Sequence, residues 1–191
     1  MWLRRGTLKG FLEGSILVVR TISVEYKLSL VNAREIEPFP RAVNQEVDSI
    51  VKRATLDLDS AHPRKSLSGQ FIALFEAGGW KRDANLYFEP SRVGTTHYLK
   101  NRMLVQVSWR HYEKIGTEML RFQVEYDKEH ITGGVYICVS KRLVDTLKKR
   151  HPESKESRNL TTSITMEKAV EYLSIVGEAI TVPIAIMGLI P

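Results

Sequence analysis

The sequence predicts a mixed α/β fold in which helices flank a central β-sheet. In residues 103–109 every second residue is apolar, which is the period of a strand with two unlike faces. Residues 117–130 place apolar side chains (Met119, Leu120, Val124, Tyr126) at near-helical spacing among charged ones, and Gly133 and Gly134 are expected to end this helix. Val135–Val139 is a short apolar run typical of a strand covered on both faces. Strand, helix and buried strand form a βαβ unit, whose two strands are normally parallel.

The elements before this unit are predicted from the spacing of apolar residues and from the positions of glycine and proline. Residues 1–14 lack a pattern and are expected to form a loose arm, whereas residues 15–30 alternate apolar and polar side chains, which predicts one or two strands. Arg41–Ala54 and Ser66–Ala77 each carry an apolar stripe at helical spacing, and a glycine pair follows the second helix. Trp80–Phe88 is a candidate strand that ends before a proline.

The elements after the unit complete an α/β order. Lys141–Arg150 predicts a helix with an apolar inner side and a basic outer side. The segment 151–163 is polar and predicts a mobile loop. Thr165 is expected to cap a helix that runs to about Val176, and residues 180–190 supply a last strand. We expect all residues, 1–191, to form a single domain.

Composition limits the class of protein. The net charge of +6 and the pI of about 9.4 favour polyanions, first nucleic acid and second an anionic membrane surface. Cys138 is the single cysteine, so an intrachain disulfide and a cysteine-based zinc site are excluded, and a reducing cytoplasm fits. Lys9 and Glu13 interrupt the apolar stretch near the N-terminus, and no run reaches the roughly 18 apolar residues that a membrane span needs. We expect a soluble, cytoplasmic protein.

The central unit carries a family resemblance. His97 precedes a strand that reads Gln106-Val107-Ser108-Trp109, and the strand after the helix reads Gly134-Val135-Tyr136-Ile137. These segments resemble the BglII/BstYI group of type II restriction endonucleases, in which an acidic residue precedes Glu-Val-Gln/Glu-aromatic on a strand and Gly-Val-x-Ile follows. The helix that ends in Gly79-Trp80-Lys81 and the C-terminal residues 182–191 are also similar, so the resemblance covers about two thirds of the chain.

The resemblance implies a function together with the fold. It implies a restriction-endonuclease-like central mixed β-sheet flanked by α-helices. It also implies sequence-specific, Mg²⁺-dependent cleavage of double-stranded DNA within a restriction–modification system, by a homodimer. The alternative on the same scaffold is a non-cleaving DNA-binding or regulatory protein. A third possibility is a globular interaction module whose basic charge serves only solubility.

The candidate catalytic residues depart from the group's pattern. Where the group has acids, this chain has His97, Gln106 and Ser108, which are neutral oxygen or nitrogen donors and weak ligands for Mg²⁺. Three interpretations stay open: the match is shifted in register or other acids rebuild the site, the site is degenerate, or His97 acts as a base or a metal ligand. The acids within reach include Glu113 and Glu118 as catalytic candidates. Gln106 and Glu89 are the candidate metal ligands, and the remaining acids are Asp57, Asp59 and Asp127.

Basic residues are the candidate DNA contacts, because each can neutralise a phosphate. Arg110 and His111 directly follow the strand that bears the expected active face, and the polar loop offers Arg158 and Asn159 as base readers. The full set of expected contacts is Lys81, Arg82, Arg110, His111, Lys141, Arg142, Arg158 and Asn159. Further cations available to phosphates are Arg64, Lys65, Lys148, Lys149 and Arg150.

Overall fold

The computed structural model describes residues 21–23, 25–31, 41–57, 60, 62–82, 95–153, 159 and 162–191. Within them the elements are β1 (Thr21–Ser23), β2 (Glu25–Val31), α1 (Arg41–Arg53), β3 (Thr55–Asp57), α2 (Pro63–Ala77), β4 (Lys81–Arg82), β5 (Thr95–Lys100), β6 (Met103–Ser108), the 3₁₀ turn η1 (Tyr112–Lys114), α3 (Ile115–Asp127), β7 (Gly133–Val139), α4 (Lys141–Arg150), α6 (Met166–Val176) and β8 (Ile184–Ile190). The expected arm 1–14, the strand beyond Arg82 and most of the polar loop lie outside the described residues.

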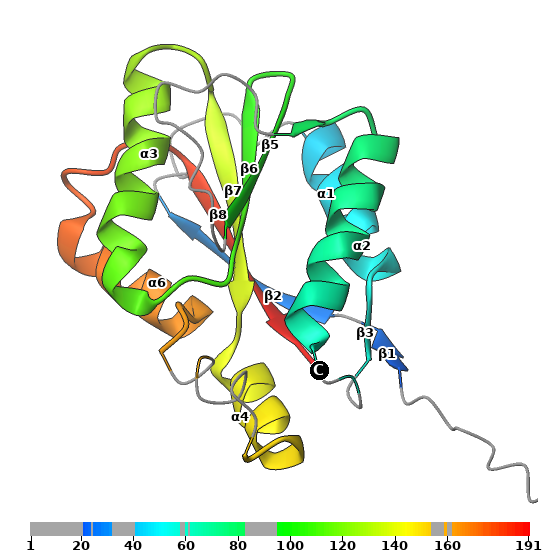
Figure 1. The fold of residues 1–191 in the computed structure, drawn as a ribbon. Helices are drawn as coiled ribbons and strands as arrows, with labels where there is room; N and C mark the ends of the chain where they lie inside the picture. Colours follow the sequence, from blue (N-terminus) through cyan, green and yellow to red (C-terminus); the bar gives the residue numbers. More distant parts are fainter. Residues whose placement is uncertain are drawn as a thin grey trace, which may run out of the picture.

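A six-stranded mixed sheet, in the order β2-β8-β7-β6-β5-β4, is the centre of the described part of the chain (Figure 1). β6 and β7 are parallel neighbours joined through α3, so the predicted βαβ unit is confirmed. A second crossover through α4 and α6 makes β8 parallel to β7. β5 pairs antiparallel with β6 through a tight hairpin, in which Asn101 and Arg102 both have positive φ.

Helices cover both faces of this sheet (Figure 1). α1 and α2 pack on one face, together with the apolar side of α4, against residues such as Val105 and Val107. α3 and α6 pack on the other face, against residues such as Leu104 and Cys138. The mixed α/β class expected from the sequence is therefore confirmed. No helix in the described residues is long and apolar enough to cross a bilayer.

The parity of each strand decides which side chains face α3. Val105 and Val107 lie in the core beneath α1 and α2, so Gln106 and Ser108 point to the α3 side. All six residues of β6 are buried, and β6 is an interior strand. Residues 106 and 108 therefore do not lie on the solvent face of an edge strand.

Two expectations for α3 were wrong. Gly133 and Gly134 do not end the helix: α3 ends at Asp127, and the two glycines begin β7. Gly134 serves close packing, because a Cβ at this position would collide with the Phe122 ring. The buried stripe is also rotated, since Leu120 is 48% exposed while Glu118 and Arg121 are buried. The buried side of α3 is rotated because Glu118 and Arg121 have polar partners inside the fold, and a pattern of apolar residues does not reveal such partners.

Helix boundaries agree with the sequence where capping chemistry marks them. Ser140 caps α4 by accepting a hydrogen bond from the backbone N–H of Leu143, at 3.1 Å. The predicted cap of α6 is confirmed, since the Thr165 hydroxyl accepts from the Lys168 N–H at 3.4 Å. α2 begins at Pro63, one turn's length before the expected start, because proline suits the first helical position.

Candidate functional site

A buried polar cluster lies between the sheet and α3. We define it as His97, Gln106, Ser108, Glu118 and Tyr136. The strand register creates it: on β6 Gln106 is paired with His97 of β5 on one side and with Tyr136 of β7 on the other, while Ser108 lies two residues further along β6. Glu118 enters from the first turn of α3. All five side chains are buried, which is unusual for polar groups without a specific role or a full set of partners.

Hydrogen bonds connect three members of this cluster in a row. The Gln106 Nε2 donates to Glu118 Oε2, and the Gln106 Oε1 lies 3.2 Å from His97 Nε2. Because the amide nitrogen of Gln106 serves the carboxylate, its oxygen is left to accept from the imidazole N–H. Gln106 thus fixes both the carboxylate and the histidine.

Two arginines balance the charge of Glu118. Its Oε1 lies 3.4 Å from Arg110 Nη1 and 3.7 Å from Arg121 Nη1, and its side chain has no exposed surface. A carboxylate so deeply buried needs cationic or hydrogen-bonding partners to remain ionised. One negative charge between two guanidinium groups gives this part of the site an excess of positive charge.

Tyr136 and Ser108 complete the floor of the cluster. Burial, and secondarily the charge of Glu118, raise the pKa of Tyr136 well above its ordinary value of 10.0, so the phenol is neutral at physiological pH. Ser108 Oγ accepts a hydrogen bond from the backbone N–H of Arg110 at 3.4 Å. This bond fixes the chain where β6 ends.

The donors in this cluster do not form a magnesium site by themselves. Mg²⁺ prefers octahedral oxygen ligands and usually one or two carboxylates together with substrate phosphates. The cluster offers one carboxylate, and its oxygens are already engaged by an amide and two arginines. Within the described residues no three or more His, Cys, Asp or Glu side chains are grouped to hold a metal ion. Glu89 lies outside the described residues, so its role as a metal ligand stays a prediction.

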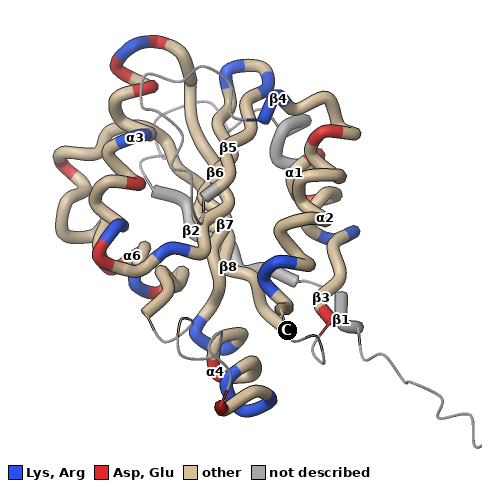
Figure 2. Tube along the Cα trace, viewed as in Figure 1, with Lys and Arg blue, Asp and Glu red and all other residues tan. Residues whose placement is uncertain are grey.

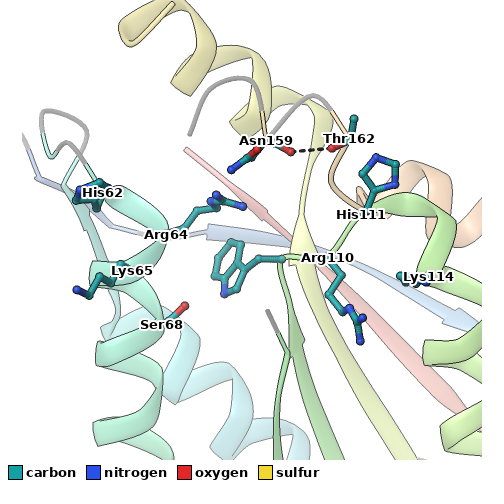
Figure 3. Close-up of a pocket in the computed structure, with 10 residues that line it drawn as sticks. His62, Arg64, Lys65, Ser68, Arg110, His111, Lys114, Asn159 and Thr162 are labelled. Carbon is teal, nitrogen blue, oxygen red and sulfur yellow. Dashed lines mark hydrogen bonds between the residues drawn. The ribbon is translucent and has the colours of Figure 1, made fainter. Parts of the chain in front are cut away.

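An open basic pocket adjoins the cluster, at the end of the sheet where β6 stops. Its volume is about 590 Å³. It is lined by His62, Arg64, Lys65, Ser68, Trp109, Arg110, His111, Lys114, Asn159 and Thr162. Four of these residues are lysine or arginine and none is acidic. Figure 3 shows the Arg64 guanidinium, at the start of α2, extending into the opening, with Arg110 and Lys114 on the other side, whereas the Lys65 ammonium points away from it. Such a pocket attracts phosphate groups.

Arg110 belongs to both the pocket and the cluster. It lines the basic pocket, and its guanidinium lies 3.4 Å from the buried carboxylate of Glu118. The residue is placed there because it lies two residues after the end of β6, where the backbone leaves the sheet. An anion bound in the pocket would therefore share a cation with the cluster.

The structure separates the other catalytic candidates from this site. Glu113 lies in η1, is 67% exposed and faces His111 at 3.6 Å rather than the cluster. Asp127 ends α3, where it accepts a hydrogen bond from Gln123 at 2.7 Å. Asp57 lies in β3, and Asp59 is outside the described residues. Of the candidate acids in the described residues, Glu118 is the one that reaches Gln106.

The candidate DNA contacts fall into three places. Arg110, His111 and Asn159 line the basic pocket. Lys81 and Arg82 form β4 at the sheet edge, where Arg82 lies 3.3 Å from Glu76. Arg158 is outside the described residues. The remaining two, Lys141 and Arg142, are exposed on the first turn of α4.

Sequence reasoning missed several residues of the site. Tyr136 shares the parity of Gly134 and Cys138 on β7, so the strand period could have placed it facing α3. Arg121 lies three residues after Glu118, a spacing that brings side chains together on a helix. Lys114 lines the pocket, and no sequence pattern distinguished it; Trp109 also lines it, and the sequence marked it only as the aromatic residue of the family motif.

Comparison with known proteins agrees with this architecture. Residues 27–189 match the family described as restriction endonuclease BglII/BglIII. The crystal structure of free BglII has a TM-score of 0.56 and 18% sequence identity, over 87% of this chain and 80% of that one. BglII complexed with a DNA 16-mer has a TM-score of 0.60 and 16% identity, over 87% and 78% of the two chains. No curated protein gave a significant match.

The family match spans most of the chain, and both solved structures share its fold. The resemblance noted in the sequence is thus confirmed. The chain belongs to the BglII/BglIII family of type II restriction endonucleases.

Proposed function

We propose that this chain binds duplex DNA at the basic pocket and cleaves it through the adjoining cluster. The observation that carries the proposal is the position of Arg110, which lines the pocket and contacts Glu118. A phosphate held by Arg110 would lie next to the one described carboxylate of the cluster. Proximity of this kind is what a hydrolytic site requires.

Binding rests on the charges of the pocket. Arg64, Lys65, Arg110 and Lys114 can each neutralise a phosphate, and Asn159 offers an amide that can reach a base edge. The N-terminus of α2, whose first turn has no acidic residue, adds the positive end of a helix dipole. Support from a relative is limited to BglII itself, which has been crystallised with a DNA 16-mer.

Hydrolysis of a phosphodiester needs a group that takes a proton from water and a cation that balances the phosphate charge. We assign the first role to Glu118 and the second to Arg110. Gln106 is a positioning residue, because its amide fixes the carboxylate. Mg²⁺ is the cofactor proposed for cleavage, although the described donors do not form its site unaided.

The test compares two glutamates of similar position in the chain. Glu118→Gln should lower plasmid cleavage in Mg²⁺ or Mn²⁺ by about 100-fold or more, which is typical of a lost acid–base group. Glu113→Gln should leave cleavage unchanged, because Glu113 is exposed and faces only His111 among the pairs described. Thermal unfolding of both variants controls for stability. If Glu118→Gln cuts as fast as the parent protein, the assignment is wrong.

One observation favours a second function, DNA binding without cleavage. The residues that the resemblance aligns with the group's metal-binding positions, His97, Gln106 and Ser108, include no acid. A parent protein that retards DNA in gels with strong salt dependence, yet leaves mixed plasmid DNA intact in both metal ions, would have this function.

The remaining features of the proposal follow from the substrate. We propose a homodimer, because a two-fold protein suits a palindromic site. A restriction–modification system in a reducing cytoplasm is the proposed setting, which fits the buried, unpaired Cys138. Mass measurement in solution, with and without DNA, tests the dimer.

A further inference from the structure

We propose that α4 is a second DNA-backbone-binding surface, which extends the contact beyond the basic pocket. The inference rests on the proposed DNA binding and adds a second place on the molecule. α4 carries five basic residues in ten, Lys141, Arg142, Lys148, Lys149 and Arg150, against one acid, Asp145. Figure 2 shows these cations along the helix.

The cations of α4 lie opposite its packed side. Leu143, Val144 and Leu147 are buried against the core beneath α1 and α2. Residues seven apart share a helix face, so Lys141 aligns with Lys148 and Arg142 with Lys149. The two rows are each about 10 Å long, which matches the axial rise of about three phosphates of one DNA strand. Among ion pairs between described residues, none involves these four side chains.

Helix stability does not explain the whole pattern. Cations in the last turn of a helix favour the negative end of its dipole, which accounts for Lys148, Lys149 and Arg150. Lys141 and Arg142 lie in the first turn, where the same dipole disfavours cations, and α4 itself has no acid there. Glu167 of α6 accepts a hydrogen bond from the backbone N–H of Lys141 at 3.0 Å, but no ion pair between described residues joins it to either side chain. Their presence therefore suits a ligand that is itself negative.

The sheet topology places this surface beside the basic pocket. β6 and β7 are parallel neighbours, so their C-terminal ends lie at the same edge of the sheet. Arg110 follows the end of β6 by two residues, and Lys141 follows the end of β7 by two residues. In Figure 1, α4 extends from this edge, at the end of the molecule where α2 and α3 begin. One duplex could thus contact both surfaces.

The chemistry favours DNA over a membrane as the partner. Helices that bind membranes insert an apolar face into the lipid. The apolar face of α4 is already buried in the core, and the exposed large apolar residues in the described part of the chain are Tyr112, Leu120 and Ile175, none of them on α4. What α4 presents to solvent is charge alone, which suits a polyanionic backbone.

The experiment measures the salt dependence of DNA affinity without Mg²⁺. Each lost phosphate contact lowers the slope of log K against log salt by about 0.9 for duplex DNA. Lys141→Gln with Arg142→Gln, and separately Lys148→Gln with Lys149→Gln, should each lower the slope by about 1 to 2 on a duplex of about 24 base pairs.

The matched control is Lys52→Gln with Arg53→Gln. These two residues are exposed cations in the last turn of α1, so the variant loses the same net charge as either α4 variant and the same dipole contact as the Lys148/Lys149 variant. It also breaks the ion pair of Lys52 with Asp48, at 3.0 Å. The slope of log K against log salt for this control should fall only by the amount that the loss of net charge causes, which is less than the fall expected for the α4 variants. Circular dichroism checks that each variant retains its helices.

Three outcomes overturn the inference. In the first, both α4 variants keep the parent slope on this duplex. In the second, the control lowers the slope as much as they do, which reduces the effect to net charge. In the third, the α4 variants lose binding to vesicles of anionic lipid and keep the parent DNA affinity, which would make the surface a membrane contact. A parent protein that does not bind the duplex overturns the proposed function as well, so the two failures are distinguishable.

Discussion

Gln106 holds the buried polar cluster together, because its single amide serves His97 on one side and Glu118 on the other. An amide can do this without a metal ion, since it supplies one donor and one acceptor. A carboxylate at the same place could not donate to Glu118, and two buried carboxylates repel each other unless a proton or a cation lies between them. The residue type at position 106 thus decides whether the cluster needs a cation.

Gln106→Glu tests this argument. Without divalent ions the variant should lose about 1 to 3 kcal/mol of unfolding free energy, because the hydrogen bond to Glu118 becomes a repulsive contact. Mn²⁺ or Mg²⁺ should restore part of this loss, since a ligand that binds only the folded state stabilises it. Urea unfolding with and without the ion measures both effects.

Gln106→Ala is the matched control for this variant. It also loses the hydrogen bonds of the amide, but it brings no second carboxylate, so divalent ions should leave its stability unchanged. Equal stabilisation of both variants by the ion would contradict the placement of position 106 beside Glu118.

For single residues, the sequence predicted which side chains share a face of the strand, but it did not predict which side chains they contact. The alternation in β6 placed Gln106 and Ser108 on one face, whereas the pairing of Gln106 with His97 across the β5–β6 hairpin was not predicted and comes from the structure. Glu118 was one of several acids in reach, and only the helix rotation selects it. A charged residue on an amphipathic helix normally faces water, so the pattern favoured an inward Leu120. Buried arginine partners reversed that preference, and no pattern of apolar residues contains them.

α3 is the element that brings the carboxylate to the sheet, and its distance from β7 depends on Gly134. A methyl group at Gly134 would enter the space of the Phe122 ring. Phe122 lies one helical turn after Glu118, so any displacement of the ring moves the carboxylate. Packing and chemistry are therefore coupled through this helix.

Gly134→Ala should destabilise the protein by about 1 to 3 kcal/mol, the usual cost of overpacking a core. It should also lower cleavage, because α3 is pushed from the sheet with Glu118. Thermal unfolding and a cleavage assay at a temperature where the variant is folded measure the two effects separately.

Gly69→Ala provides the control within a helix. A Cβ at Gly69 meets nothing within 4 Å, and the residue lies on the exposed side of α2. Alanine should stabilise α2 by about 0.5 to 1 kcal/mol and leave cleavage unchanged. If the two variants had the same stability, the close contact between Gly134 and Phe122 would not constrain α3.

Local sequence signals predicted the helix bounds correctly where tertiary packing does not override them. The bounds of α4 and the cap of α6 agree with the sequence because Ser140 and Thr165 supply a cap directly before a stripe of apolar residues. The prediction that Gly133 and Gly134 end α3 was wrong, because glycine occurs both at helix ends and at close contacts between elements. Which of the two it marks depends on a ring that lies far away in sequence.

The whole molecule joins two cores across one sheet, and β7 is central to both. Its residues facing α3 include Tyr136 and Cys138, whose side chains are fully buried. Burial raises the pKa of both groups above their ordinary values of 10.0 and 9.0, because ionisation in an apolar interior is costly. The folded protein keeps both groups protonated where the unfolded chain begins to ionise them.

This difference predicts an alkaline loss of stability. Below about pH 9 the thiol is protonated in both states and the contribution is constant. Above it, the unfolded chain loses a proton that the folded protein retains, so the unfolding free energy falls by up to about 1.4 kcal/mol per pH unit for each group. Cys138 contributes first and Tyr136 follows above its ordinary pKa of 10.0.

Cys138→Ala isolates the contribution of the thiol. The variant should be less stable than the parent at about pH 8, because a small cavity remains in the core. Between about pH 8 and pH 10 it should lose about 1 kcal/mol less than the parent, since one ionising group has been removed. Urea unfolding across this range measures both slopes, and all other alkaline groups are common to the two proteins. Parallel slopes would mean that the thiol ionises as readily in the folded protein as in the unfolded chain, which would place Cys138 in contact with water.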